Sequence, residues 1–298
     1  MTAPPVDIAE LVTRRASAPR EIADRWAARR RRPLLRADGR SLIIAADHPA
    51  RGALGVRDDP MRMANRADLL RRLATALSRP GVDGVLGTAD ILEDLLLLGL
   101  LDDMAVIGSM NRAGLRGATF EFDDRFTGYR ARDVAALGLQ AGKMLVRIAL
   151  DDACTARTLE SASAAVTDLA RRGVVALIEP FWSTRDADGQ VTNLLDPDSV
   201  ITSIQVAAGL GATSAYTWLK LPVVPEMGRV LDATTMPTLL LGGDPSGSPE
   251  EIYASWASAL AHPCARGLVV GRTLLYPASG DVATAVDTAA RLVHGGHA

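Results

Sequence analysis

The chain has 298 residues, of which 48% are hydrophobic, so it is long enough to bury one large core or two modest ones. Its 33 basic and 35 acidic residues leave a formal net charge of −2, which gives no indication of a nucleic-acid or membrane partner. Small-molecule partners are expected, and homo-oligomerisation stays open. No signal-peptide stretch and no run of about 20 apolar residues is present, so we expect a cytoplasmic protein. Cys154 and Cys264 lie far apart and predict neither a disulfide framework nor a zinc site.

The first part of the chain predicts a helical leader. Apolar residues are spaced among charged ones over residues 6–32, with an interruption near Pro19 and a stop at Pro33. We read the basic run Arg29–Arg32 as a solvated helix end rather than a phosphate contact. The predicted organisation is an N-terminal helical extension over residues 1–36 and a catalytic domain over residues 37–298.

The rest of the chain alternates short apolar runs, typical of strands buried on both faces, with longer amphipathic stretches. The eight runs are Ser41–Asp47, Gly84–Thr88, Ala105–Gly108, Lys143–Leu150, Val174–Phe181, Ser214–Leu221, Thr238–Gly243 and Gly267–Gly271. Helices are expected between them, for example over Ala64–Leu77, Thr155–Arg172, Pro197–Leu210, Pro249–Leu260 and Asp281–Val293. This pattern predicts an α/β fold of the (β/α)8 TIM-barrel type, with the irregular region Asn111–Arg132 as an active-site loop.

The lysine content is unusual. The 33 basic residues are 31 arginines and two lysines, Lys143 and Lys220. A codon or genomic bias toward arginine is one explanation, and under it the two lysines are chance survivors. Arginine stays protonated and cannot act as an amine nucleophile, whereas a buried lysine can lose its proton and form a Schiff base. The two remaining lysines are therefore candidates for chemistry.

Polar residues interrupt several of the apolar runs near the end that carries the active site in this fold. Asp47 ends the first run, Glu179 interrupts the fifth and Lys220 the sixth. Asp47 is equally compatible with a loop cap, and Glu179 with a structural Glu–Lys pair. Burial depresses the pKa of a lysine, as an amine nucleophile requires. Lys143 opens the fourth run, which by itself places it toward the wrong end.

A Gly-Gly pair and a Gly-Arg pair near the ends of the last two runs indicate an anion site. Gly242 and Gly243 end the seventh run, and Gly271 ends the eighth and is followed by Arg272. Glycine lets backbone N–H groups approach a ligand, and the loops after strands 7 and 8 hold phosphate in many barrels of this type. Glycine is also common in ordinary turns. Together, the two pairs and the arginine favour phosphate binding.

These motifs resemble the class I ketose-bisphosphate aldolases, both the fructose and the tagatose kinds, from about residue 40 to residue 276. The segments that carry the resemblance are Ala45-Ala46-Asp47, Lys143-Met144-Leu145-Val146-Arg147, Ile178-Glu179-Pro180, Leu219-Lys220 with Pro222, Gly242-Gly243 and Gly271-Arg272. The resemblance implies a Schiff base on Lys220, a second active-site lysine in Lys143, and an acid–base role for Glu179. It implies that Asp47 handles a substrate hydroxyl and that the glycines and Arg272 hold phosphate.

Three departures from the fructose enzymes affect the expected substrate. Leu241 stands where a serine is expected, Phe181 where a second glutamate is expected, and His48 where an acidic residue is expected. More distant members of the superfamily cleave deoxyribose phosphate or the phosphorylated deoxy-keto-gluconate of inositol breakdown. Deoxyribose-phosphate aldolases usually place their helper lysine on strand 7, so the position of Lys143 favours a ketose-type substrate.

The expected mechanism is covalent. Unprotonated Lys220 attacks the carbonyl, Glu179 moves protons, Lys143 lowers the pKa of Lys220, and Asp47 orients or deprotonates the hydroxyl. No cofactor is expected, and the four histidines form no metal-ligand pattern, which disfavours a metal-dependent aldolase. The alternative from another class is a non-catalytic barrel that senses a sugar phosphate.

Overall fold

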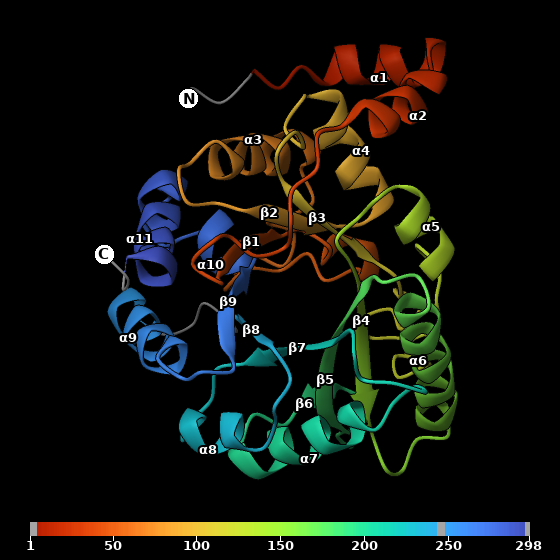
Figure 1. The fold of residues 1–298 in the computed structure, drawn as a ribbon, viewed down its shortest axis with the longest axis vertical. Helices are drawn as coiled ribbons and strands as arrows, with labels where there is room; N and C mark the ends of the chain where they lie inside the picture. The colour runs from red at the N-terminus through yellow and green to blue at the C-terminus, as the bar shows by residue number, and fades with distance from the viewer. Residues whose placement is uncertain (1–4, 243–247, 296–298) are drawn as a thin grey trace.

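The computed structural model describes residues 5–242 and 248–295. Within them, eight parallel strands form a closed ring, because β4 pairs with β5 as well as with β3 (Figure 1). The ring consists of β1 (Ser41–Ala45), β2 (Gly84–Gly87), β3 (Ala105–Ser109), β4 (Ala141–Ile148), β5 (Val175–Arg185), β7 (Thr217–Pro222), β8 (Thr238–Leu241) and β9 (Ala265–Val270). The predicted (β/α)8 barrel is confirmed.

Helices surround this ring on its outer side (Figure 1). They are the 3-10 turn η1 (Pro49–Arg51) and α3 (Arg66–Leu77), α4 (Ala89–Leu97), α5 (Ala131–Ala136), α6 (Cys154–Ala170), α7 (Pro197–Ala208), α8 (Met227–Asp232), α9 (Pro249–Leu260), α10 (Arg272–Leu275) and α11 (Val282–His294). Several begin at a side-chain cap. The side chains of Asn65, Asp196, Ser248 and Asp281 each accept a hydrogen bond from a backbone N–H of the first helical turn.

The pleat of the strands divides the core into two parts. One set of strand residues, which includes Ile43, Leu177 and Val269, packs inside the ring. The alternate set, which includes Leu42 and Ile44, packs against the helices. Both sets are almost fully buried, which explains why the strands appear as continuous apolar runs in the sequence.

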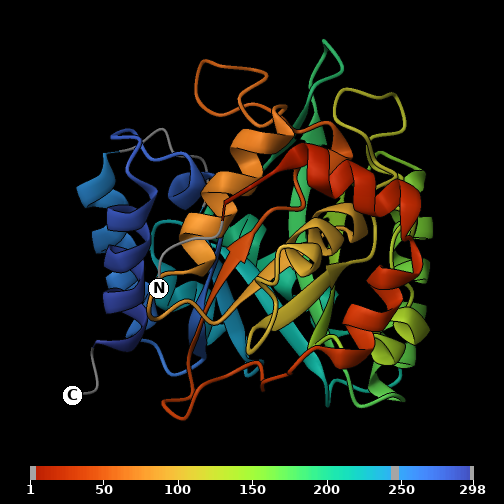
Figure 2. The ribbon, with the colours of Figure 1, turned by 90° about the horizontal axis from the view of Figure 1, so that it is seen from above.

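The N-terminal extension packs on the outside of the barrel beside α4 (Figures 1 and 2). It forms α1 (Ile8–Ser17) and α2 (Arg20–Ala28), separated at Pro19 as the sequence predicts. Arg14 donates to the carbonyl of Leu97 over 2.9 Å, and Arg15 pairs with Asp94 over 2.8 Å. The domain boundary at residue 36 stays a prediction.

Most strand ends differ from the sequence-based boundaries, and the ends of β5 and β8 are two examples. β5 continues to Arg185, four residues beyond the predicted end, and forms an antiparallel hairpin with β6 (Val191–Asn193). β8 ends at Leu241, and Gly243 lies outside the described residues.

None of the helices in the described part of the chain has the length and hydropathy needed to cross a membrane.

Candidate active site

The candidate site is the next layer of inward-pointing side chains above the barrel core. Side chains alternate along a strand, so the residue two positions after an interior one also points inward. Ala141 and Leu177 belong to the interior cluster, and two residues further along lie Lys143 and Glu179. Lys220 follows Trp218 by the same step, and all three charged residues line one pocket.

Lys143 reaches this layer although it lies near the start of its strand. β4 begins at Ala141, so Lys143 is its third residue and not its first. In the register of the sheet, Lys143 pairs with Ser109, the last residue of β3. The stagger between neighbouring barrel strands therefore lifts the start of β4 to the level at which β3 ends. Lys143 therefore lines the pocket, although its place at the start of the predicted run indicated the opposite end of the barrel.

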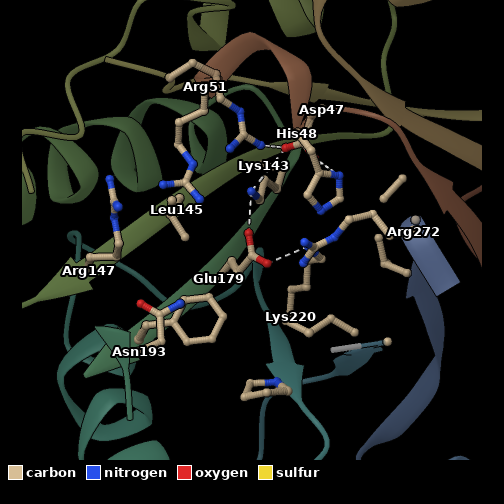
Figure 3. Close-up of a pocket in the computed structure, with 18 of the residues that line it drawn as sticks. Asp47, His48, Arg51, Lys143, Leu145, Arg147, Glu179, Asn193, Lys220 and Arg272 are labelled. Atoms are coloured by element: carbon tan, nitrogen blue, oxygen red, sulfur yellow. Dashed lines mark hydrogen bonds and ion pairs between the residues drawn. The ribbon is translucent and has the colours of Figure 1, made fainter. Parts of the chain in front are cut away.

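Two lysines and two carboxylates form a connected ionic cluster in the pocket (Figure 3). Lys220 Nζ donates to Glu179 Oε1 over 2.6 Å. Lys143 Nζ pairs with Glu179 Oε2, and it also donates to Asp47 Oδ2 over 3.2 Å. Glu179 thus bridges the two lysines. All four side chains are buried, which makes each interaction stronger than it is on a surface.

Burial and the neighbouring charges shift the pKa values of this cluster. Burial lowers the pKa of Lys220, and Arg112 and Arg272 lower it further against the opposing effect of Glu179. Burial, and next Arg112, bring the pKa of Lys143 well below its ordinary value. Burial alone would raise the pKa of Glu179, but the two lysines hold it well below the ordinary value. Glu179 is therefore a carboxylate, and amine forms of the lysines become available closer to neutral pH.

Asp47 is held by three donors. Its Oδ2 accepts from Ser109 Oγ over 3.1 Å and from Lys143, and it pairs with the guanidinium of Arg112. Arg112 also donates through Nε to Ser109 Oγ over 2.9 Å. Arg112 lies in the region that we expected to form an active-site loop, and this loop does reach the site.

The pocket has a volume of about 220 Å³ and an excess of positive charge. It is lined by four arginines in addition to the two lysines, namely Arg51, Arg112, Arg147 and Arg272. Sequence reasoning identified only Arg272. Arg147 could have been identified from the sequence, because it lies four residues after Lys143 and therefore on the same face of β4. Arg51 and Arg112 lie in loops after β1 and β3, and the sequence has no local pattern that marks them.

Arg147 holds the loop in place at one side of the pocket. Its guanidinium donates to both carboxylate oxygens of Asp124, over 2.9 and 2.8 Å, and to Glu121 over 2.9 Å. Arg51 shares the Glu121 carboxylate over 3.2 Å. Arg147 thus holds the loop through two acidic residues with a bidentate contact to Asp124, whereas Arg51 pairs with Glu121.

The predicted phosphate-binding residues lie together at the ends of β8 and β9. Gly242, Gly271 and Arg272 line the pocket, and Gly243 falls outside the described residues. Figure 3 shows Arg272 at the pocket. A Cβ atom on Gly271 would lie 2.5 Å from the carbonyl oxygen of Ala45, so the close approach requires glycine. Arg272 Nη1 lies 3.4 Å from the carbonyl oxygen of Gly55.

One histidine, His48, is among the residues that line the pocket. His48 lines the pocket directly after Asp47, and we had noted it from sequence only as a departure from a family pattern. Among residues 5–242 and 248–295, no group of three or more His, Cys, Asp or Glu side chains is placed to hold a metal ion.

Comparison with solved structures supports the fold. An archaeal fructose 1,6-bisphosphate aldolase is 18% identical, with a TM-score of 0.65 over 92% of this chain and 100% of that one. A second archaeal aldolase structure, with its catalytic lysine covalently bound to the carbinolamine intermediate of the substrate, is 18% identical, with a TM-score of 0.66 over 91% of this chain and 99% of that one. At these identities the likeness shows the fold alone.

A much nearer relative is the crystal structure of Cgl0159 from Corynebacterium glutamicum. It is 57% identical, with a TM-score of 0.95 over 98% of this chain and 99% of that one. A comparison with curated protein sequences gives no match. The sequence profile of the Cgl0159-like family matches residues 39–290. The chain therefore belongs to the Cgl0159-like family.

Proposed function

We propose that the protein is a class I aldolase, an aldehyde-lyase that reversibly cleaves a carbon–carbon bond of a sugar phosphate through a Schiff base on Lys220. One observation carries the proposal. The two lysines of the chain are both buried in one pocket and share the carboxylate of Glu179. A purely structural ion pair needs one lysine. A second cation beside an amine nucleophile lowers its pKa, as Schiff-base chemistry requires.

Lys220 is the better nucleophile of the two. Within the described residues, Lys143 pairs with two carboxylates, Asp47 and Glu179, whereas Lys220 pairs with that of Glu179. Burial lowers the pKa of both amines, and the two carboxylate contacts of Lys143 favour its ammonium form against this effect. Lys143 then serves as the fixed cation that depresses the pKa of Lys220 and stabilises negative charge on a substrate oxygen.

Glu179 is placed to move the protons of Schiff-base formation. Its Oε1 lies 2.6 Å from Lys220 Nζ, within the distance at which a general acid or base works. It takes a proton from the ammonium, and it returns a proton to the carbinolamine hydroxyl as water leaves. The resulting iminium accepts the electron pair of the breaking carbon–carbon bond.

The charge of the pocket supports an anionic substrate. Arg272 and the glycines at the ends of β8 and β9 suit a phosphate group, and the arginines around Lys143 add further positive charge. The candidate substrates are a ketose bisphosphate and a phosphorylated keto-deoxy sugar acid, such as 6-phospho-5-dehydro-2-deoxygluconate. A deoxyribose-phosphate type of substrate is the alternative.

Borohydride trapping tests the proposal. The purified protein is incubated with a panel of phosphorylated ketoses, keto-deoxy sugar acids and deoxyribose 5-phosphate, then reduced and digested for peptide mass mapping. We expect a stable adduct on the Lys220 peptide, with release of an aldehyde from the same sugar. Lys220→Met should abolish the adduct, and Lys143→Met should reduce its yield without moving it.

The panel also separates the catalytic role from the sensor alternative. A sensor would bind a sugar phosphate saturably and give neither adduct nor aldehyde. An adduct on Lys143 in the wild-type protein would reverse the assignment of the two lysines. Loss of activity with EDTA would point to a metal-dependent reaction.

A further inference from the structure

The proposed mechanism leaves one proton transfer to be assigned. When the carbon–carbon bond breaks, the hydroxyl on the carbon that becomes the aldehyde must lose its proton. Asp47 is the residue that the sequence suggests for this step. In the structure, however, its Oδ2 already accepts from Lys143 and Ser109 and pairs with Arg112. This oxygen has little capacity left for a substrate proton.

His48 lies beside Asp47 and is not engaged in this way. Its Nδ1 is the ring nitrogen nearer to Asp47, 3.9 Å from Oδ1, the carboxylate oxygen that the three donors leave free. This nitrogen is buried and has no hydrogen-bond partner among the described residues. A short movement of the ring would let Nδ1–H donate to Oδ1. The other ring nitrogen, Nε2, would then carry the lone pair, as in other carboxylate–histidine pairs.

The backbone around His48 fixes the ring at the pocket wall. The carbonyl of His48 accepts from the N–H groups of Arg51 and Ala53, over 3.2 and 3.3 Å. A Cβ atom on Gly271 would lie 2.9 Å from His48 Cε1, so the imidazole packs directly against the end of β9. Figure 3 shows the ring on the pocket side of this wall, near Arg272.

The barrel topology places His48 across the pocket from Glu179. His48 follows β1, and Glu179 is on β5, the strand four places away from β1 in either direction around the ring. A substrate bound to Lys220 on the adjacent β7 therefore has Glu179 on one side and His48 on the other. The two acid–base groups address different atoms of the substrate.

We propose, on the basis of the aldolase function proposed above, that His48 is a second acid–base catalytic residue, which takes the proton from the substrate hydroxyl during bond cleavage. Nε2 accepts this proton, and the hydroxyl oxygen becomes the carbonyl oxygen of the leaving aldehyde. The electron pair of the breaking carbon–carbon bond moves to the iminium, which becomes an enamine. The imidazolium then returns its proton to the enamine carbon. His48 is neutral again, and no further reactant is consumed.

The charges around His48 agree with a neutral resting state. Burial is the largest cause that brings its pKa well below the ordinary value, and nearby cations add to the effect. The charged groups that face it are Asp47, Lys143, Glu179, Lys220 and Arg272. A neutral imidazole accepts a proton at neutral pH, which the first step requires.

Proton exchange tests the proposal separately from Schiff-base formation. Dihydroxyacetone phosphate is the probe, because its iminium loses a carbon-bound proton to form the same kind of enamine, by the reverse of the return step. The exchange into D2O is followed by NMR, and borohydride trapping is measured in parallel. The variants are His48→Ala and His48→Gln, with His262→Ala as the control, since His262 lies outside the pocket and bonds to Asp232.

We expect the Lys220 adduct in every variant, and exchange slowed about 10²-fold or more in both His48 variants, the usual contribution of a general acid–base group. Added imidazole should raise the exchange rate of His48→Ala with imidazole concentration, which a structural role would not produce. Melting temperatures within a few degrees of wild type show that the variants are folded.

Three outcomes would overturn the proposal. They are exchange at the wild-type rate in the His48 variants, slow exchange that imidazole leaves unchanged, and loss of the adduct in the His48 variants alone. If the wild-type protein gives no adduct with any sugar of the panel, the proposed aldolase function is contradicted, and the proposed role of His48 with it.

Discussion

Glu179 on β5 and Lys220 on β7 are joined by a hydrogen bond of 2.6 Å between Oε1 and Nζ. The two strands are neighbours, and Ile178 pairs with Leu219 in their register, so the next residue of each strand is a member of this pair. The second carboxylate oxygen of Glu179 contacts Lys143 on β4, the neighbour of β5 on its other side. One carboxylate therefore ties three adjacent strands together at the level of the site.

Glu179→Gln should affect both activity and stability. The amide cannot move protons, so we expect the rate of aldehyde release to fall by about 10²–10⁴-fold. It also leaves two buried lysines without their shared carboxylate, and breaking a buried ion pair costs about 3–5 kcal/mol. Urea unfolding should show a lower free energy of unfolding at pH 7.

Replacement of both lysines by methionine in the Glu179→Gln background supplies the control. It removes the uncompensated charges, so we expect part of the lost stability to return while activity stays absent. If Glu179→Gln unfolds like the wild-type protein, the carboxylate does not hold the lysines as described.

The rate of adduct formation should rise with pH through the lowered pKa of Lys220, because the neutral amine attacks the carbonyl. The midpoint should lie below the ordinary lysine value, since burial and nearby cations favour the amine. Glu179 stays ionised over this range because its pKa is held well below normal. The measurement is initial trapping rate against pH. A midpoint at the ordinary lysine value would contradict the burial of Lys220.

The same shifts predict how stability changes with pH. The window is the pH range between the lowered pKa of the folded state and the ordinary lysine pKa. In this range a lysine of the folded protein binds fewer protons than the same lysine of the unfolded chain. The contribution of Lys143 and Lys220 to the free energy of unfolding therefore increases as pH rises through this window. Comparison of wild type with the Lys143→Met, Lys220→Met double variant by urea unfolding isolates this contribution.

Gly271→Ala should disturb the site although it adds only one methyl group. The new Cβ atom would lie 2.5 Å from the Ala45 carbonyl oxygen and 2.9 Å from His48 Cε1, so backbone or ring must move. We expect a stability loss of about 1–3 kcal/mol, typical of overpacking, and a reduced rate of turnover.

Gly228→Ala is the matched control for this change. A Cβ atom there meets nothing within 4 Å, and Gly228 lies in α8, where alanine is the better helix former by up to about 1 kcal/mol. We expect unchanged activity and equal or higher stability. Equal melting temperatures for the two alanine variants would argue against the close packing of Gly271.

His294 should make the stability of the chain depend on pH near neutrality. Its ring, at the end of α11, contacts Asp38 over 2.5 Å and Asp83 over 3.0 Å. Burial alone would lower its pKa, but hydrogen bonds to the two carboxylates raise it above the ordinary value. The stabilisation is then fully present below the ordinary histidine pKa and is lost as pH rises through the raised one.

His294→Gln tests this by urea unfolding at several pH values. We expect the variant to lose about 1.5–3 kcal/mol at acidic pH, the usual value of a hydrogen bond to a charged group, and less at alkaline pH. A loss that is the same at every pH would show that His294 acts by packing and not through its charge.

The sequence by itself determined the barrel and half of the site. Apolar runs alternate with amphipathic stretches along the chain. The spacing of apolar residues within each is a local property that requires no knowledge of contacts. Lys220 and Glu179 stood out because a charged residue inside a buried run is costly unless it is paired. Gly271 and Arg272 stood out because they follow a strand at the position where this fold binds phosphate.

Only the tertiary structure brought in His48, Arg51, Arg112 and Arg147. Three of them lie in the loops after β1 and β3, and they meet Arg147 of β4 because the sheet closes into a ring, which no local pattern encodes. The position of Lys143 also depended on closure, since strand stagger sets the height of each residue above the barrel core. Local periodicity decides which way a side chain points, whereas the stagger and closure of the ring decide which side chains it meets.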